Sequence, residues 1–152
     1  MPTDSRLMVM SIHTRHANSI MSGDKTVELR KTRPVVAEGQ PVAIYATSPT
    51  RAVVATCIID SVVVGDPKDL KDDLLQPASV TGDEYDMYFA GSPQAVALHL
   101  RDVVVLAHPI TLDSIRNRRS WHPPQTWHFL SADRVAAFMG STPSTPHVAE
   151  LM

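Results

Sequence analysis

Residues 23–31, "GDKTVELRK", place several charged side chains on what the pattern predicts to be a short strand. Lys25, Glu28 and Arg30 could line a polar binding site, and a lysine beside an arginine can have a lowered pKa and act as a base. The same residues could equally form a solvated strand face with a weak cross-strand ion pair. Composition alone does not decide between these two interpretations.

The other residues with reactive side chains form no recognised catalytic or metal-binding motif. His13 and His16 are three positions apart, but no third ligand is evident, so we expect no metal and no cofactor. Cys57 is the only cysteine, which excludes a disulfide within the chain, and its apolar neighbours predict a buried, inert thiol. Dinucleotide-binding, phosphate-loop and serine-hydrolase motifs are absent from the sequence.

The composition is that of an ordinary globular domain. The chain has 152 residues, of which 43% are hydrophobic, with a net charge of −2 and a pI near 6.4. This charge argues against a protein that coats nucleic acid through phosphate contacts alone. We expect a cytoplasmic protein without a membrane partner, because no signal peptide and no apolar run of about 20 residues is present. The sequence does not indicate the oligomeric state.

Alternating and helical patterns predict an α+β domain at residues 1–139, followed by a flexible Ser/Thr/Pro tail at 140–152. The two strands at 41–47 and 51–64 should form a hairpin, and a break near Asp102 could divide the last long strand in two. Strands are expected at 7–12, 25–31, 41–47, 51–64, 95–110 and near 127–130. Short helices are expected within 13–23, 66–75, 81–91, 111–119 and 131–139.

The predicted elements around the charged strand would hold its polar face rigidly. Thr14 could cap the preceding helix, and Gly23 is suited to end that helix in the left-handed conformation. Val27 and Leu29 would anchor the strand in the core. Rigid support of this kind is what a binding site requires.

The segment "SIHTRHANSIMSGDKTVELRKTRP" resembles the signature of the ASCH domain family, in which Gly-x-Lys-x-x-Glu-x-Arg follows a short helix. Gly23, Lys25, Glu28 and Arg30 match this pattern position by position. The similarity extends in order over about residues 7–130. It implies a PUA-like small β-barrel of five to six strands with short peripheral helices.

The resemblance also implies a site and a class of ligand. Members of the family are implicated in RNA binding and modification, and their pocket lies between the barrel and the helix before the signature strand. A carboxylate beside a guanidinium could read the polar edge of a base there, while a lysine meets phosphate or hydroxyl. Carried over, the residues are Lys25 and Glu28 as catalytic candidates, and Arg30, Tyr45, Ser48, Arg51 and Gln125 as ligand-binding candidates.

Three functions remain open on this resemblance. The first is binding of RNA or a modified nucleotide. The second is metal-independent hydrolysis, either of RNA or, less favoured, of N4-acetylcytidine. The amidohydrolase branch uses a lysine, a threonine and a glutamate. Lys25 matches that lysine, but Glu28 stands at the threonine position and the glutamate falls near Ala78. The third is binding of a ligand that is not a nucleic acid.

Overall fold

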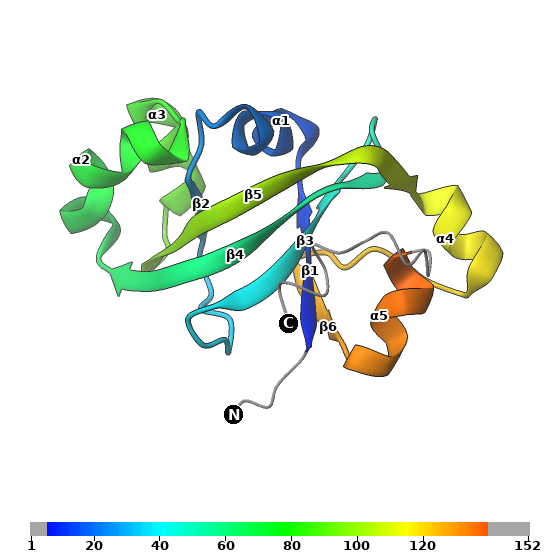
Figure 1. Ribbon diagram of the computed structural model, residues 1–152. Helices are drawn as coiled ribbons and strands as arrows, with labels where there is room; N and C mark the ends of the chain where they lie inside the picture. The colour runs from blue at the N-terminus through cyan, green and yellow to red at the C-terminus, as the bar shows by residue number, and fades with distance from the viewer. Residues whose placement is uncertain (1–5, 140–152) are drawn as a thin grey trace.

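The computed structural model describes residues 6–139, and the predicted tail at 140–152 lies outside the described residues. Six strands form a single mixed sheet in the order β2-β5-β4-β3-β1-β6. Figure 1 shows α2 and α3 at one end of this sheet, α4 and α5 at the other, and α1 between them. The elements are β1 (Leu7–Ile12), α1 (Thr14–Ser22), β2 (Val27–Arg30), β3 (Gln40–Ala46), β4 (Ala52–Gly65), α2 (Pro67–Ala78), α3 (Gly82–Phe89), β5 (Ala95–Thr111), α4 (Leu112–Arg118), β6 (Trp127–Leu130) and α5 (Ala132–Met139).

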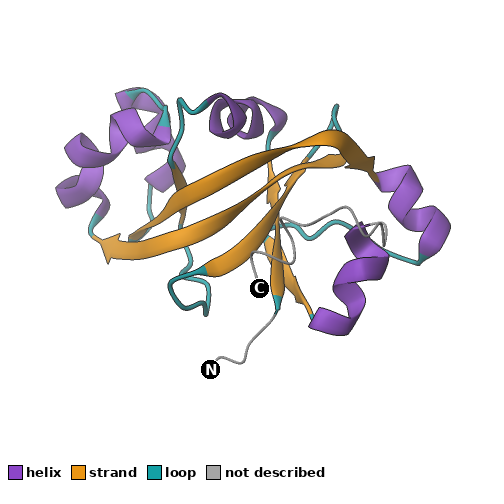
Figure 2. Cartoon of the chain, viewed as in Figure 1, coloured by secondary structure: helices purple, strands orange, loops and turns teal. Residues whose placement is uncertain are grey.

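The strand pairing confirms the predicted hairpin and resolves the question at Asp102. β3 and β4 pair antiparallel, as expected, whereas β1 pairs with β3 in parallel. β5 continues as one strand through Asp102, which has a positive φ of 54°. Register shifts between β4 and β5 bend this long ribbon (Figure 2).

The sheet is curved but is not closed into a barrel. Within residues 6–139, β2 and β6 are edge strands that do not pair with each other. β2 pairs only with the start of β5, over Val96 to His99. The Arg30 side chain, rather than a backbone ladder, reaches from β2 to the Ser11 carbonyl oxygen of β1. The α+β class and six strands are therefore found, but the predicted barrel closure is not confirmed.

Three hydrophobic clusters pack against the sheet, and two of them lie on opposite faces of β3. Ile44 of β3 belongs to the core beneath α1, together with Ile20 and Leu98. Tyr45, the next residue, belongs to the core beneath α4 and α5, where its ring meets Trp121 edge-on at 5.6 Å. Successive strand residues point to opposite faces, so neighbouring residues of β3 serve different cores.

The starts of α2 and α3 follow the sequence signals, but α2 extends beyond its expected end at residue 75 to Ala78 and α3 ends at Phe89, before Gly91. Asp66 caps α2, and Thr81 and Glu84 form a capping box at α3. The predicted Thr14 cap is wrong, because α1 begins at Thr14 and its hydroxyl donates to the Thr47 carbonyl oxygen at 2.8 Å. Over residues 6–139, no helix combines the length and the apolar character needed to cross a membrane.

Gly23 ends α1 at a φ of 90°, as the sequence predicted, and the chain then turns directly into Lys25. Gly23→Ala should lower the free energy of unfolding by about 1–2 kcal/mol, because a Cβ is strained in this conformation although space is open around it.

Gly82→Ala is the matched control, because Gly82 lies in α3 without a positive φ and its added Cβ would make ordinary contacts. Urea denaturation measures the free energy of unfolding of both variants. Equal stability of the two would contradict the role assigned to Gly23.

Candidate functional site

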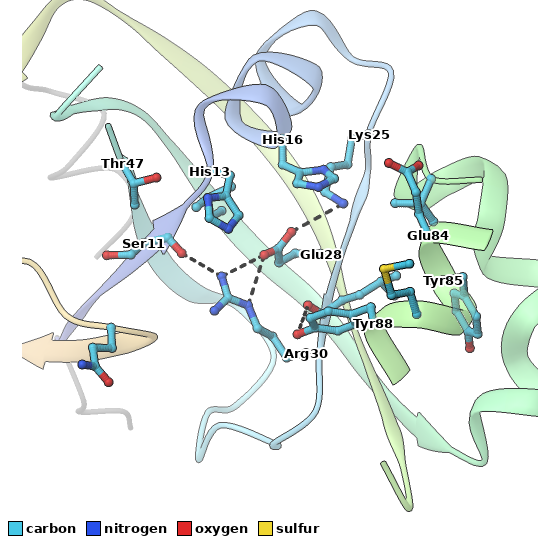
Figure 3. Close-up of a pocket in the computed structure, with 15 residues that line it drawn as sticks. Ser11, His13, His16, Lys25, Glu28, Arg30, Thr47, Glu84, Tyr85 and Tyr88 are labelled. Carbon is cyan, nitrogen blue, oxygen red and sulfur yellow. Dashed lines mark hydrogen bonds and ion pairs between the residues drawn. The ribbon is translucent and has the colours of Figure 1, made fainter. Parts of the chain in front are cut away.

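A cavity of about 520 Å³ opens between α1, β2 and α3. Figure 3 shows side chains from these elements pointing into a common space. Ser11 of β1, Thr47 after β3 and Gln125 before β6 line its remaining side. The cavity therefore gathers residues from distant parts of the chain around the signature strand.

The floor of the cavity is a buried carboxylate between two cations. Glu28 Oε2 accepts hydrogen bonds from Arg30 Nε at 3.1 Å and Nη2 at 2.8 Å. Glu28 Oε1 lies 3.5 Å from Lys25 Nζ. The side chains of Lys25, Glu28 and Arg30 are only 2%, 10% and 11% exposed. Lys25, Glu28 and Arg30 thus form one buried network rather than a solvated face, whereas Asp24 and Lys31 of the same segment are exposed.

Lys25 and Arg30 also bind main-chain oxygens outside β2. Lys25 Nζ donates to the Ala78 carbonyl oxygen of α2 at 2.7 Å. Arg30 Nη2 donates to the Ser11 carbonyl oxygen of β1 at 2.9 Å. Burial lowers the pKa of Lys25, and the nearby Glu28 carboxylate opposes that shift. The network ties together three elements that the strand ladders do not connect directly.

His16 of α1 lines the cavity beside this network. Its Nδ1 atom is buried and has no hydrogen-bond partner among the described residues. Burial lowers the pKa of His16, and the neighbouring Lys25 lowers it further, so its imidazole is neutral at pH 7. From the sequence, His16 was expected only as a possible metal ligand, and its position at this cavity was missed. The signal that could have identified it is a polar residue in an amphipathic helix directly before the signature strand.

α3 supplies an aromatic and apolar wall. Tyr88 lines the cavity, its hydroxyl donates to the Leu29 carbonyl oxygen at 3.3 Å, and Lys31 Nζ lies 4.9 Å from its ring centre. Met87 lines the cavity and is 81% exposed, while Tyr85 is buried against Phe89. An exposed apolar side chain beside a fixed ring offers a flat ligand a surface for stacking.

The structure divides the predicted site residues into two groups. Gln125 joins Lys25, Glu28 and Arg30 at the cavity, whereas Tyr45, Ser48 and Arg51 do not line it. Strand alternation explains the difference for Tyr45, which points into the core beneath α4 and α5.

Ser48 and Arg51 are exposed in the turn that joins β3 to β4, and Arg51 has a positive φ of 52°. Burial raises the pKa of Tyr45, and the Arg51 guanidinium opposes that shift. The Tyr45 hydroxyl and Arg51 therefore belong to a separate polar region at the β3–β4 turn.

No group of three His, Cys, Asp or Glu side chains in residues 6–139 is placed to hold a metal ion. Cys57 is buried in the sheet, and burial raises the pKa of its thiol to about 12. Such a thiol is a poor nucleophile.

No protein-family model matches the chain. A curated protein of Zymomonas mobilis named ASCH domain-containing ribonuclease is 31% identical over 140 residues, which cover 91% of this chain and 94% of that protein. The chain belongs to the ASCH domain family. A crystal structure of ASCH from Zymomonas mobilis superposes with a TM-score of 0.83 at 31% identity, covering 90% of this chain and 96% of that one.

The ASCH fold is also similar to a more distant structure. The N-terminal domain of Staphylothermus marinus McrB has a TM-score of 0.58 at 12% identity, covering 90% of this chain and 94% of that one. This similarity concerns the fold alone.

The residues of the amidohydrolase branch are incomplete in this ASCH domain. Ala78, where that branch has its glutamate, contributes only a backbone oxygen, and this oxygen accepts the hydrogen bond from Lys25. Glu28, at the threonine position, is held by Arg30. Neither the threonine nor the glutamate of that branch therefore has a matching side chain at its position in this chain.

Arg30→Met should destabilise the ASCH domain by about 3 kcal/mol, because it leaves a buried Glu28 carboxylate with Lys25 as its remaining cation. Arg101→Met is the matched control. Arg101 also pairs with carboxylates, those of Asp60 and Asp102, but its side chain is 47% exposed, so the loss should be less than about 1 kcal/mol.

Chemical denaturation of the two variants measures the difference. Similar losses in both would mean that the Glu28 network contributes no more than a surface ion pair.

Proposed function

We propose that this protein binds single-stranded RNA and holds one unstacked nucleotide in the cavity between α1, β2 and α3. The observation that carries the proposal is the buried Lys25–Glu28–Arg30 network at the cavity floor. A fixed carboxylate and guanidinium can pair with the polar edge of a base. A cavity of about 520 Å³ is within the usual range for small-ligand sites.

The relatives support RNA as the ligand class. The Zymomonas mobilis protein that is similar over 91% of this chain is named a ribonuclease. The wall of the cavity also suits an unstacked base, because Met87 is exposed beside the ring of Tyr88. Stacking of a base on an aromatic side chain contributes about 1–3 kcal/mol.

The charge distribution supports recognition in a pocket rather than along a basic surface. The net charge is −2, so few phosphates can be neutralised. The arginines of residues 116–119 do not form a free basic cluster. Arg116 Nε donates to the Trp121 carbonyl oxygen, and Arg118 donates to the Ala137 and Phe138 carbonyl oxygens at the end of α5. These two side chains stabilise the fold at the opposite end of the sheet.

The affinity for a short single-stranded RNA should therefore fall shallowly with salt. One to three phosphate contacts correspond to a slope of log K against log salt between about −0.7 and −2. Fluorescence anisotropy at several salt concentrations measures the slope. A slope several times steeper would place binding on a charged surface instead.

Arg30→Gln should remove most of the RNA affinity, because it deletes a cavity donor and frees Glu28 from its partner. Arg134→Gln removes the same charge from the exposed face of α5 and should leave the affinity within about twofold. Melting temperatures of both variants show that each is folded at the assay temperature. Equal affinities of the two variants would refute the cavity as the site.

A second candidate function is metal-independent cleavage of the bound RNA, which the similarity to a named ribonuclease favours. Lys25 lines the cavity with a pKa lowered by burial, and Glu28 lies 3.5 Å from it. A lysine with a lowered pKa beside a carboxylate can transfer a proton to or from a substrate hydroxyl.

If cleavage occurs here, labelled single-stranded RNA should be cut in the presence of a metal chelator, and Lys25→Met should abolish the cutting. Arg51→Gln, at a position of the β3–β4 turn that does not line the cavity, is the comparison variant. Gel analysis of the RNA products measures cleavage by both variants. Cleavage that survives Lys25→Met but disappears in Arg51→Gln would place the reaction at the β3–β4 turn and not in the cavity.

A further inference from the structure

We propose that the cavity selects guanine, with His16 and Glu28 accepting hydrogen bonds from the base and Arg30 donating one to it. This inference rests on the proposed RNA-binding function and names the base that the same site accepts. It follows from the hydrogen-bonding capacity that the cavity residues leave unused.

His16 provides the first unused acceptor. A neutral imidazole has one donor nitrogen and one acceptor nitrogen. His16 lines the cavity, and its buried Nδ1 atom has no partner among the described residues, a state that costs free energy unless a ligand satisfies it. The cations Lys25 and Arg15 both lower the pKa of His16, which favours the neutral imidazole with one acceptor nitrogen. We therefore assign Nδ1 as a hydrogen-bond acceptor for a ligand.

Glu28 provides the second unused acceptor. Its Oε2 atom already accepts two hydrogen bonds from Arg30. Its Oε1 atom has a single cation, Lys25 Nζ, at the long distance of 3.5 Å. A carboxylate oxygen can accept two hydrogen bonds, so Oε1 retains capacity for a donor in the cavity.

Arg30 provides an unused donor group. Its Nε and Nη2 atoms are bonded to Glu28 and to the Ser11 carbonyl oxygen. Its Nη1 atom has no hydrogen-bond partner within residues 6–139, although Arg30 lines the cavity. A guanidinium has five N–H donors, and the two on Nη1 can bind a carbonyl oxygen.

The best complement to two acceptors and one donor group is an edge with two N–H donors and one carbonyl. The Watson–Crick edge of guanine has the N1–H and N2–H donors beside the O6 acceptor. Adenine and cytosine each present one amino group beside acceptor atoms, and uracil presents one N–H between two carbonyls. Guanine alone among the four bases can satisfy His16 Nδ1, Glu28 Oε1 and Arg30 Nη1 together. Tyr88 and Met87 would then contact the face of the base.

The test compares short RNAs of one length, UUGUU, UUAUU, UUCUU and UUUUU, by fluorescence anisotropy with the unmodified protein. UUGUU should bind about tenfold more tightly than each of the others, because a matched base edge discriminates by this order. Replacement of guanine by inosine removes only the N2 amino group and should weaken binding about fivefold. This ligand-side change needs no protein variant.

His16→Phe keeps an aromatic ring and removes the acceptor. It should abolish the preference for UUGUU, whereas His108→Phe, at an exposed position of β5, should leave it unchanged. Melting temperatures of both variants verify that they are folded. A guanine preference that persists in folded His16→Phe would overturn the role of His16.

The affinity for UUGUU should also fall in acid, at a pH below the ordinary pKa of imidazole, because burial lowers the pKa of His16 and a protonated His16 no longer accepts a hydrogen bond. The other titratable and charged groups at the cavity are Arg15 and His13 around α1, Lys25, Glu28 and Arg30 at β2, and Glu84 of α3. These groups still contribute to the pH dependence of affinity in His16→Phe. The part due to His16 is therefore the difference between the pH profiles of the unmodified protein and of His16→Phe. Identical profiles would contradict the proposal.

The outcomes separate this inference from the proposed function. If UUGUU binds most tightly, and if inosine and His16→Phe each reduce this preference, guanine selection and RNA binding are both supported. Equal binding of all four RNAs, or preference for another base, overturns guanine selection and leaves RNA binding in place. Absence of binding to any of the RNAs overturns both.

Discussion

The arrangement of this ASCH domain depends on one buried carboxylate. Glu28 is held between Lys25 and Arg30, and these two cations extend the network to the Ala78 carbonyl oxygen of α2 and the Ser11 carbonyl oxygen of β1. A buried charge is costly unless it is paired and hydrogen-bonded, so each member of the network requires the others. The network connects β2 to elements with which it shares no ladder, and it also forms the cavity floor.

The structural role and the proposed ligand-binding role therefore involve the same residues. The Nη1 donor of Arg30 and the Nδ1 atom of the neutral His16 ring have no partner among the described residues. Unpaired polar atoms at a cavity are sites where a ligand gains hydrogen bonds that the protein alone does not make. The wall formed by Tyr88 and Met87 adds a surface for stacking to this polar floor.

Much of the fold could be predicted from the sequence because its local signals are strong. Asp66, Thr81 and Gly23 mark helix ends by side-chain or backbone chemistry that acts within a few residues, and the hairpin of β3 and β4 follows from two β-branched runs. Barrel closure could not be predicted in the same way, since it depends on long-range geometry. The gap between β2 and β1 is spanned by the Arg30 side chain, a feature that strand patterns do not encode.

The site was predicted only in part for a related reason. Lys25, Glu28, Arg30 and Gln125 line the cavity, but the face on which Tyr45 lies depends on the register of β3, and Tyr45 points into the opposite core. His16 was missed because a single histidine on a short helix has no distinctive spacing.

An NMR titration of the isotopically labelled protein with a short single-stranded RNA tests the central claim most directly. Occupation of the cavity predicts that the largest shift changes fall on α1, β2 and α3, including the His16 ring and the Lys25 ammonium group. Changes confined to the β3–β4 turn near Ser48 and Arg51, with those groups unaffected, would contradict it.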